Sequence, residues 1–411
     1  MSLSQILDRI SMGKIVVVRE QLMKQAAAGK KVVRFESGDP NFDMAPHVIE
    51  AVRKAAETGK THYIPNNGIP ELRRALYDKV TRRNGIPVRS FEDLFVTNGA
   101  MHALYVTFAC LLAQGDEVIV PDPMWTEVVE NIKLAGGVPV RVSLHAYGEY
   151  SAEEIAKHIT PKTKAIFLNT PHNPTGIVLP QQQLAAIAAL AKERGLWIIS
   201  DEAYEHVVYA PSRHVSIASL DGSYIDRIVS IFSCSKSYAM SGMRVGYIAT
   251  TDKTLQDRLG KLLRCTINGV NSVAQWAALA AVTGPEEHLH AMQKEYQLRR
   301  DMLIEALNAV EGITVIPPQG SFFLWAQCSP ELYERLGCSS ADEVSEKLAR
   351  EGIGSAPGSA FSERYVDALR FAFSCSTAMV EEGRWQLQRE LTGEVPAAAL
   401  VGSVEDHRTT V

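Results

Sequence analysis

The sequence lacks the marks of several classes of protein. Its 411 residues carry a formal net charge of -5 at pH 7, so no basic field is available to attract nucleic acid. The 6 cysteines are scattered without a CxxC motif or paired spacing, which predicts neither a zinc site nor a disulfide framework. No apolar run reaches membrane-spanning length, and the first residues lack the apolar core and cleavage site of a signal peptide. We therefore expect a cytoplasmic protein that binds no nucleic acid, membrane or metal.

The composition that is present is that of a globular protein with more than one core, with 46% hydrophobic and 22% charged residues. Residues 93–120, DLFVTNGAMHALYVTFACLLAQGDEVIV, have the order strand, glycine turn, helix and strand. This order is typical of a βαβ unit and predicts an α/β fold with a parallel sheet. The glycine spacing is not the GxGxxG of dinucleotide-binding folds, so a Rossmann domain is disfavoured.

The two ends of the chain have other patterns. Residues 31–43 predict a short strand and a turn, and a long amphipathic helix follows the central part at residues 288–310. The apolar segments beyond it are typical of antiparallel strands separated by helices, an α+β unit. We predict a large domain over residues 49–290, a small domain built from residues 1–48 and 291–392, and a flexible tail at residues 393–411.

The segment IVSIFSCSKSYAMSGMRVGYIAT, residues 228–250, places Lys236 at the end of a buried strand. Desolvation lowers the pKa of a buried ammonium and frees its amine for a Schiff base. Arg244 follows beside two glycines, which let the backbone approach a ligand and bring a guanidinium near that amine. The alternative is a solvated surface turn, where most lysines are found. An amine beside an anion clamp suggests a phosphorylated aldehyde.

Residues elsewhere in the chain offer partners for such a ligand. Asp201 closes an apolar strand at the sheet edge where open α/β folds bind ligands, although it could instead cap the next segment. Trp125 is either a packing residue or a flat face for a heteroaromatic ring. Arg370 lies within an apolar strand, where a charge is costly unless it meets a carboxylate. The turn at residues 99–101 begins a helix whose free N–H groups favour a phosphate.

Together these residues fit pyridoxal phosphate (PLP). Lys236 would form the imine, and Arg244, Ser233 and residues 99–101 would bind the phosphate. Asp201 would pair with the ring nitrogen, Trp125 would stack on the ring, and Arg370 would bind the substrate carboxylate. A carboxylate against the ring nitrogen keeps the pyridinium protonated, so that the ring accepts the electrons released at the substrate Cα.

Several blocks of the sequence resemble a known family. SCSKSYAMSGMRVGY, NTPHNPTG and SDEAY are similar to signature blocks of the class I/II PLP-dependent aminotransferases of fold type I, nearest to the bacterial aspartate/aromatic aminotransferase-like subgroup. SGDPNFDMAP, THYIPNNGIPELRRAL, VTNGAMHAL and GSAFSERYVDALRFAFS resemble further blocks, in the same order. The resemblance implies a large domain with a mostly parallel sheet of the seven-stranded type covered by helices, a smaller α+β domain, and a homodimer with shared active sites.

The resemblance also implies residue roles. Lys236 would be the catalytic Schiff-base lysine and proton carrier, with Asp201 at the ring nitrogen and Tyr204 at the phenolic oxygen. The implied cofactor-binding set is Gly99, Ala100, Met101, Trp125, Asn173, Asp201, Tyr204, Ser233, Lys236, Arg244 and, acting on the phosphate of the neighbouring subunit, Tyr63. The implied substrate-binding set is Gly38, Trp125, Asn173 and Arg370.

Two departures from the family pattern bear on the substrate. Aspartate-specific members often carry a lysine after the phosphate-loop glycine that reads a distal carboxylate, and this position is Met101 here. The usual tryptophan of the lysine block is Met243, a more adaptable wall. Arg264 could replace the missing lysine or lie on the surface. The departures favour a neutral or aromatic amino donor, without excluding aspartate, and 2-oxoglutarate or pyruvate as acceptor in a ping-pong mechanism.

Two other functions stay open. A PLP-dependent lyase that cleaves a C–S bond or eliminates at Cβ would use the same residues. An aminotransferase-like effector-binding domain of a transcription regulator would need a basic helix-turn-helix extension, which neither terminal sequence supplies.

Overall fold

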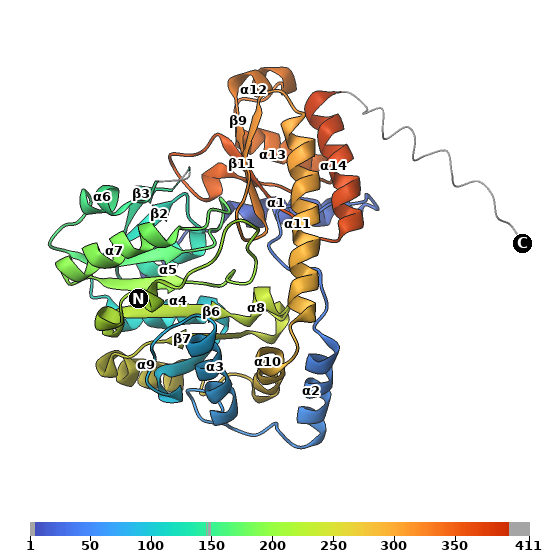
Figure 1. The fold of residues 1–411 in the computed structure, drawn as a ribbon. Helices are drawn as coiled ribbons and strands as arrows, with labels where there is room; N and C mark the ends of the chain where they lie inside the picture. The colour runs from blue at the N-terminus through green and yellow to red at the C-terminus, as the bar shows by residue number, and fades with distance from the viewer. Residues whose placement is uncertain (1–4, 145, 147–148, 394–411) are drawn as a thin grey trace, which may run out of the picture.

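The computed structural model of the protein describes residues 5–144, 146 and 149–393. Apart from Gly393, the tail predicted at residues 393–411 lies outside this part. Strands and helices alternate through the larger part of the molecule, and α11 (Glu287–Asn308) runs beside both this part and a smaller group of strands and helices (Figure 1). No helix within the described ranges is long and apolar enough to cross a membrane.

A seven-stranded sheet forms the centre of the larger part. Its strands, in spatial order, are β1 (Leu94–Asn98), β7 (Val245–Ala249), β6 (Ile228–Ser233), β5 (Trp197–Asp201), β4 (Thr163–Asn169), β2 (Glu117–Asp122) and β3 (Val138–Ser143). From β6 to β3 every pair is parallel, whereas β7 is antiparallel to both of its neighbours. The predicted α/β fold with a mostly parallel sheet is confirmed, and the reversed β7 makes the sheet mixed.

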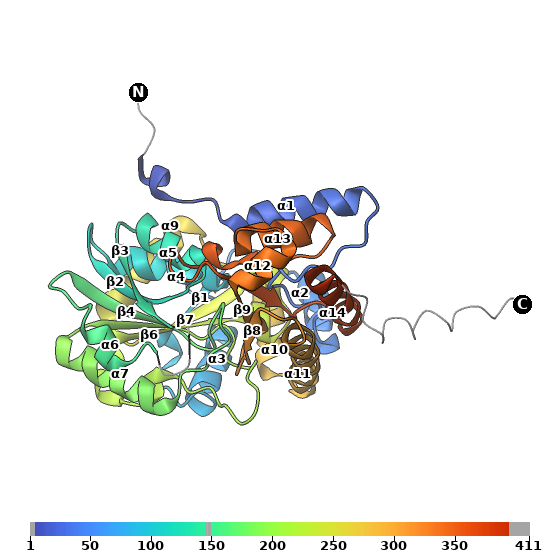
Figure 2. The same cartoon turned by 90° about the horizontal axis from the view of Figure 1, so that it is seen from above.

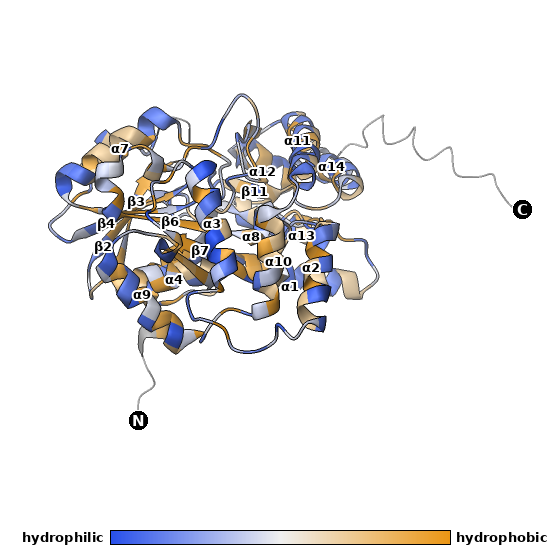
Figure 3. Ribbon diagram, turned by 60° about the horizontal axis from the view of Figure 1, so that its bottom comes forward, coloured by the Kyte–Doolittle hydropathy of each residue, from blue (hydrophilic) through white to orange (hydrophobic). Residues whose placement is uncertain are grey.

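Both faces of this sheet are covered by helices, which is why its strands are apolar at nearly every position. Along β4, Ala165 and Phe167 belong to one buried cluster, whereas Ile166 and Leu168 belong to the other, because successive side chains of a strand point to opposite faces. The first cluster includes α4 (Gly99–Leu111), α5 (Thr126–Leu134) and α9 (Lys253–Thr266). The second includes α2 (Pro46–Glu57), α3 (Pro70–Arg82), α6 (Ala152–Ala156), α7 (Gln181–Arg194) and α10 (Ser272–Thr283). Figure 3 shows the apolar strands inside and hydrophilic helix surfaces outside.

The boundaries of α2 and α3 follow from local chemistry. Pro46 and Pro70 stand at the starts of these helices, where the missing N–H would have no intrahelical partner. Gly59 and Gly85 lie just beyond their ends with φ of 72° and 68°, a left-handed conformation that glycine adopts without strain. The connection between the two helices carries Tyr63, whose side chain is exposed.

The smaller part packs helices on an antiparallel sheet. Its strands, in spatial order, are β10 (Ala356–Pro357), β11 (Ala368–Ala372), β9 (Phe323–Cys328) and β8 (Ile313–Ile316). Its helices are α11, α12 (Pro330–Leu336), α13 (Ala341–Arg350) and α14 (Thr377–Thr392), and the N-terminal α1 (Lys14–Ala27) lies along α13 (Figure 2).

This smaller part agrees with the α+β unit predicted from the sequence. The strand predicted within residues 31–43 is wrong, because only an isolated bridge between Val33 and Ile353 forms there. The domain boundaries at residues 49 and 290 stay a prediction.

A buried ion pair joins α3 to the segment that follows β5. Lys79 and Glu205 bond to each other with side chains only 2% and 7% exposed, and Asn84 Nδ2 donates to the other Glu205 oxygen at 2.8 Å. Burial by itself raises the pKa of Glu205, but the nearby Lys79 charge and the hydrogen bonds bring it down to about 2. The pair therefore anchors the backbone next to Tyr204.

Candidate active site

A cavity of about 440 Å³ opens where β4, β5 and β6 end, and most of the predicted residues line it. Asn169, Asp201 and Ser233 close these three strands, so parallel pairing brings them to one edge. Trp125 precedes α5 on the same side, and Arg370 enters from β11 of the smaller part. The cavity thus lies between the two sheets.

Lys236 lies in the short helix α8 (Cys234–Ser237), directly after β6. Its Nζ donates a hydrogen bond to the carbonyl oxygen of Gly38 at 2.5 Å. Burial lowers the pKa of Lys236 to about 8, and the nearby charge of Asp39 opposes the shift. The Lys236 amine therefore loses its proton more readily than that of an exposed lysine.

Burial also raises the pKa of Asp201 to about 7, although the N–H of Ala203 donates to its Oδ1 at 3.1 Å.

The predicted phosphate site is built where β7 meets the start of α4. Because β7 is reversed, its first residue lies at the edge where the parallel strands end, so that Arg244 reaches the cavity. Ala100 and Met101 line the cavity at the first turn of α4, where N–H groups are free. A Cβ on Gly99 would lie 2.3 Å from Arg244 Nη2, and one on Gly246 would lie 2.6 Å from the backbone nitrogen of Ala100. The backbone contact therefore requires glycine at position 246, and the left-handed φ of 76° favours glycine at position 99.

Asn173 and Tyr204 offer unused hydrogen-bonding groups to the cavity. Asn173 Oδ1 accepts from Arg370 Nη1 at 3.2 Å, which leaves its Nδ2 available. The Tyr204 hydroxyl bonds to no other described residue, and the Tyr204 ring is held edge-on by Phe322 and Phe323. These are the donors that a ring oxygen of a ligand would require.

Arg370 is 3% exposed and has no carboxylate within ion-pair distance among the described residues. Its Nη2 donates to the carbonyl oxygen of Glu36 at 2.6 Å, its Nε has no partner, and its Cζ lies 4.3 Å from the ring centre of Phe323. Burial lowers the pKa of Arg370 to about 10. A buried guanidinium without a counter-charge is costly, so this geometry suits a carboxylate supplied by a substrate.

These residues fit PLP. One oxygen of Asp201 is free to face a ring nitrogen, Tyr204 and Asn173 have donors to spare, and the first turn of α4 with Arg244 suits a phosphate. When bound, the cofactor supplies an electron sink for the substrate Cα.

Some predicted residues do not line this cavity. Gly99 packs behind the turn against Arg244, and Met243 packs against the core of the large sheet. Tyr63 is 92% exposed, and Arg264 is exposed near the end of α9. Within one chain the structure therefore does not bring Tyr63 or Arg264 to the site.

Several residues that line the cavity were not identified from the sequence. Asn169 Nδ2 donates to the carbonyl oxygen of Asp201 at 3.2 Å, and its Oδ1 accepts from the backbone of Asn173 at 2.9 Å. Its place at the end of the apolar strand TKAIFLN was a usable signal. The others are Ile15, Val16 and Arg19 of α1, Arg34, Glu36 and Ser37 before the turn at Gly38, Glu127 at the start of α5, Ala203 after β5, Ser235 of α8, Ser241, and Phe323 of β9. For α1 no local signal exists, because its position depends on packing against α13.

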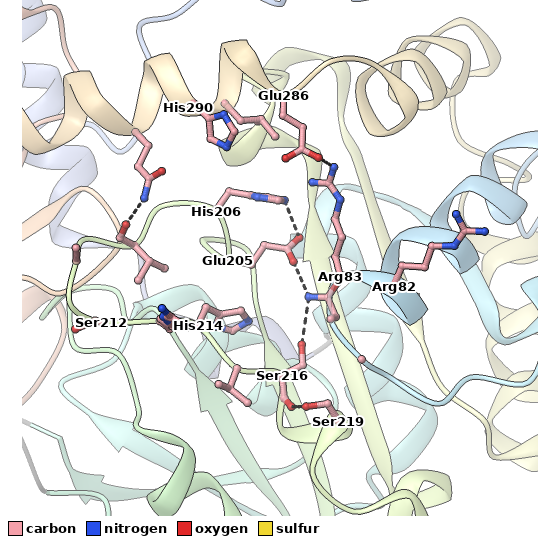
Figure 4. A pocket seen from close by; sticks show the side chains of 18 residues that line it. Arg82, Arg83, Glu205, His206, Ser212, His214, Ser216, Ser219, Glu286 and His290 are labelled. Carbon is pink, nitrogen blue, oxygen red and sulfur yellow. Dashed lines mark hydrogen bonds and ion pairs between the residues drawn. The ribbon is translucent and has the colours of Figure 1, made fainter.

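A larger cavity, of about 730 Å³, is lined by Glu205 and His206, which follow Tyr204 in the chain, and by none of the predicted site residues. Figure 4 shows His206, His214 and His290 around it, with Arg83 paired to Glu286. Within the described residues no group of three or more His, Cys, Asp or Glu side chains could hold a metal ion. We assign the active site to the smaller cavity because Lys236, Asp201 and Arg370 line it together.

Comparison with known proteins agrees with this assignment. The family model "Aminotransferase class I and II" matches residues 30–384. The chain is 33% identical over 392 residues to the aspartate aminotransferase of Geobacillus stearothermophilus, covering 95% of this chain and 98% of the relative. The structure of Thermus thermophilus aspartate aminotransferase with maleate matches with a TM-score of 0.88 at 31% identity, over 95% of this chain and 100% of that one. The aromatic aminotransferase of Pyrococcus horikoshii OT3 matches with 0.83 at 31% identity, over 90% and 99%. The chain therefore belongs to the class I and II aminotransferase family and is a PLP-dependent aminotransferase of fold type I.

Proposed function

We propose that the enzyme moves the amino group of a neutral or aromatic α-amino acid to a 2-oxo acid such as 2-oxoglutarate or pyruvate by a ping-pong mechanism, with aspartate as a further donor. The observation that carries this proposal is that Lys236, Asp201 and Arg370 share one cavity, part of whose side-chain wall is apolar. That wall includes Met101, at the position where a lysine would read a distal carboxylate, and Ile15 of α1. The named relatives include both an aspartate and an aromatic aminotransferase, and the wall favours the second kind of substrate.

The residues would share the work as follows. Arg370 binds the α-carboxylate and thereby orients the Cα–H bond toward Lys236. Nζ of Lys236 takes the proton from Cα, and its pKa of about 8 supports this role near neutral pH. Asp201 holds a proton on the ring nitrogen, while Asn173 and Tyr204 orient the ring from its phenolic oxygen.

The homodimer and its shared site also belong to this proposal. An aromatic side chain with 92% exposure, such as that of Tyr63, is uncommon on a monomer and suits a contact with a second subunit. Light scattering should give twice the mass of the chain, and Tyr63→Phe should raise the dissociation constant of the cofactor. A fully active monomer would refute this part. Arg264 as a reader of distal carboxylates and the cytoplasmic location stay predictions.

The decisive experiment is a screen of amino donors on the purified enzyme with PLP. The cofactor bound to Lys236 should absorb visible light, and a suitable donor should shift that band while an oxo acid is formed. Lys236→Ala should abolish both, whereas Lys261→Ala, an exposed lysine paired with Asp257, should change neither. Turnover retained by Lys236→Ala would contradict the mechanism. Release of ammonia and pyruvate in place of an amino and oxo acid exchange would identify a lyase.

A further inference from the structure

Glu127 brings a carboxylate to the wall of the active-site cavity, and it forms no ion pair with any described residue. It stands in the first turn of α5, two residues after Trp125. Its Oε2 is buried and has no hydrogen-bond partner within the described residues. Burial raises the pKa of Glu127, and a hydrogen bond from its own backbone N–H and the charge of Arg370 act against this shift. A buried acceptor left unpaired is costly, so a partner from outside the chain would stabilise it.

The remaining charges of the cavity have other partners or lie in water. Arg34 donates to Glu36 Oε1 from Nε at 2.8 Å and from Nη2 at 2.7 Å. Arg370 and Arg244 bind the substrate carboxylate and the phosphate under the proposed function. Arg19 is exposed, so solvent satisfies its guanidinium. Among the described residues that line the cavity, Glu36 and Glu127 each have a buried carboxylate oxygen, Oε2, without a hydrogen bond. Glu36 is paired with Arg34 through its other oxygen, whereas Glu127 forms no ion pair with a described residue.

Glu127 is linked through Asn131 to Met101, the position at which aspartate-specific family members often carry a lysine. Asn131, one turn further along α5, donates from Nδ2 to the carbonyl oxygen of Glu127 at 2.7 Å. The same Nδ2 contacts Met101 Sδ at 3.3 Å. Asn131 therefore fastens the first turn of α5 to the start of α4, and Glu127 and Met101 line the same cavity.

We infer that Glu127 accepts a hydrogen bond from the side chain of the amino substrate, and so selects neutral and aromatic amino acids that carry an O–H or N–H group over those that end in a carboxylate. This inference rests on the proposed function and narrows its substrate class. A carboxylate side chain would face a like charge, and an apolar one would leave the Glu127 oxygen unpaired. A phenol, indole or amide satisfies it.

The test compares substrates that differ only in this group. The ratio of kcat/KM is measured for glutamine over glutamate, asparagine over aspartate and tyrosine over phenylalanine. The wild-type enzyme should favour the first member of each pair by about tenfold or more, the effect of one hydrogen bond to a charged group. Glu127→Gln keeps the size of the side chain and removes its charge, and it should shrink the two amide-over-acid ratios by about tenfold.

A matched control and a binding measurement accompany these ratios. Glu130→Gln changes a carboxylate on the same helix that is already bonded to Lys133 and Ser11 and lies outside the cavity, so all three ratios should stay as in the wild type. Dead-end ligands report binding alone, and succinamate should bind the PLP-loaded enzyme more tightly than succinate, with the difference lost in Glu127→Gln.

The outcomes separate this inference from the proposed function. If no amino acid shifts the cofactor band, the proposed function fails. If transamination occurs but acids are preferred over amides and Glu127→Gln leaves the ratios unchanged, only the inference is overturned. If the enzyme prefers acids and this preference is lost in Arg19→Ala, Arg19 is the residue that selects the substrate side chain, and the inference about Glu127 is overturned.

Discussion

Replacing Arg370 tests how the cavity recognises a substrate. Its guanidinium is fixed before any ligand binds, because Nη1 donates to Asn173 Oδ1 at 3.2 Å, Nη2 donates to the carbonyl oxygen of Glu36 at 2.6 Å, and the plane lies near the rings of Phe323 and Phe361. A substrate carboxylate would add two charge-assisted hydrogen bonds, each worth about 1.5–3 kcal/mol. Arg370→Ala should therefore lower kcat/KM for amino acids by about 10²- to 10⁴-fold.

The assay follows kcat/KM for the amino donor together with the visible band of the bound cofactor. Arg370→Lys keeps a charge but loses the planar fork, so its loss should fall between those of the wild type and Arg370→Ala. The loss should be in KM for the amino acid, with the cofactor band nearly unchanged. The Arg370 substitutions should lower kcat/KM far less for an alkylamine without a carboxylate than for an amino acid. Release of the cofactor, or an equal loss for both substrates, would refute the assignment of Arg370 to the carboxylate.

Two further predictions concern stability and cofactor affinity. Lys79→Met leaves Glu205 buried without its cation, so the melting temperature should drop and largely recover in Lys79→Met/Glu205→Leu. The fall of the Glu205 pKa from 4.5 to about 2, to which Lys79, His206 and Asn84 contribute, corresponds to about 3 kcal/mol of stability. Because this folded-state pKa is depressed, its stabilisation is complete above the unfolded pKa and is lost as the pH falls toward about 2, so the wild type should lose stability in acid more steeply than the double variant. Gly246→Ala would put a Cβ 2.6 Å from the backbone nitrogen of Ala100 and should weaken PLP binding in a titration, whereas Gly242→Ala has nothing within 4 Å and should not.

Much of the fold could be predicted because its units are local. The strand, glycine turn and helix around Gly99 are written in one continuous segment, and so is the apolar strand that ends at Asp201. The reversal of β7 could not be predicted, because strand order depends on which long-range pairings bury the most surface. The short strand predicted near Val33 fails for the same reason, since its pairing with Ile353 extends over a single bridge.

The features of the candidate site are likewise of two kinds, those that the sequence predicts and those that only the tertiary structure shows. The sequence places Asp201 at the end of an apolar strand and Lys236 just after another, and since parallel strands share one carboxyl edge, it predicts that both lie at that edge. Their closeness depends on β5 and β6 being neighbours in the sheet. Only the tertiary structure shows that Arg370 has no carboxylate partner among the described residues, that Glu127 lines the same cavity as Met101, and that Lys79 pairs with Glu205. Each of these facts depends on atoms brought together from distant segments, and neither periodicity nor spacing along the chain encodes such a contact.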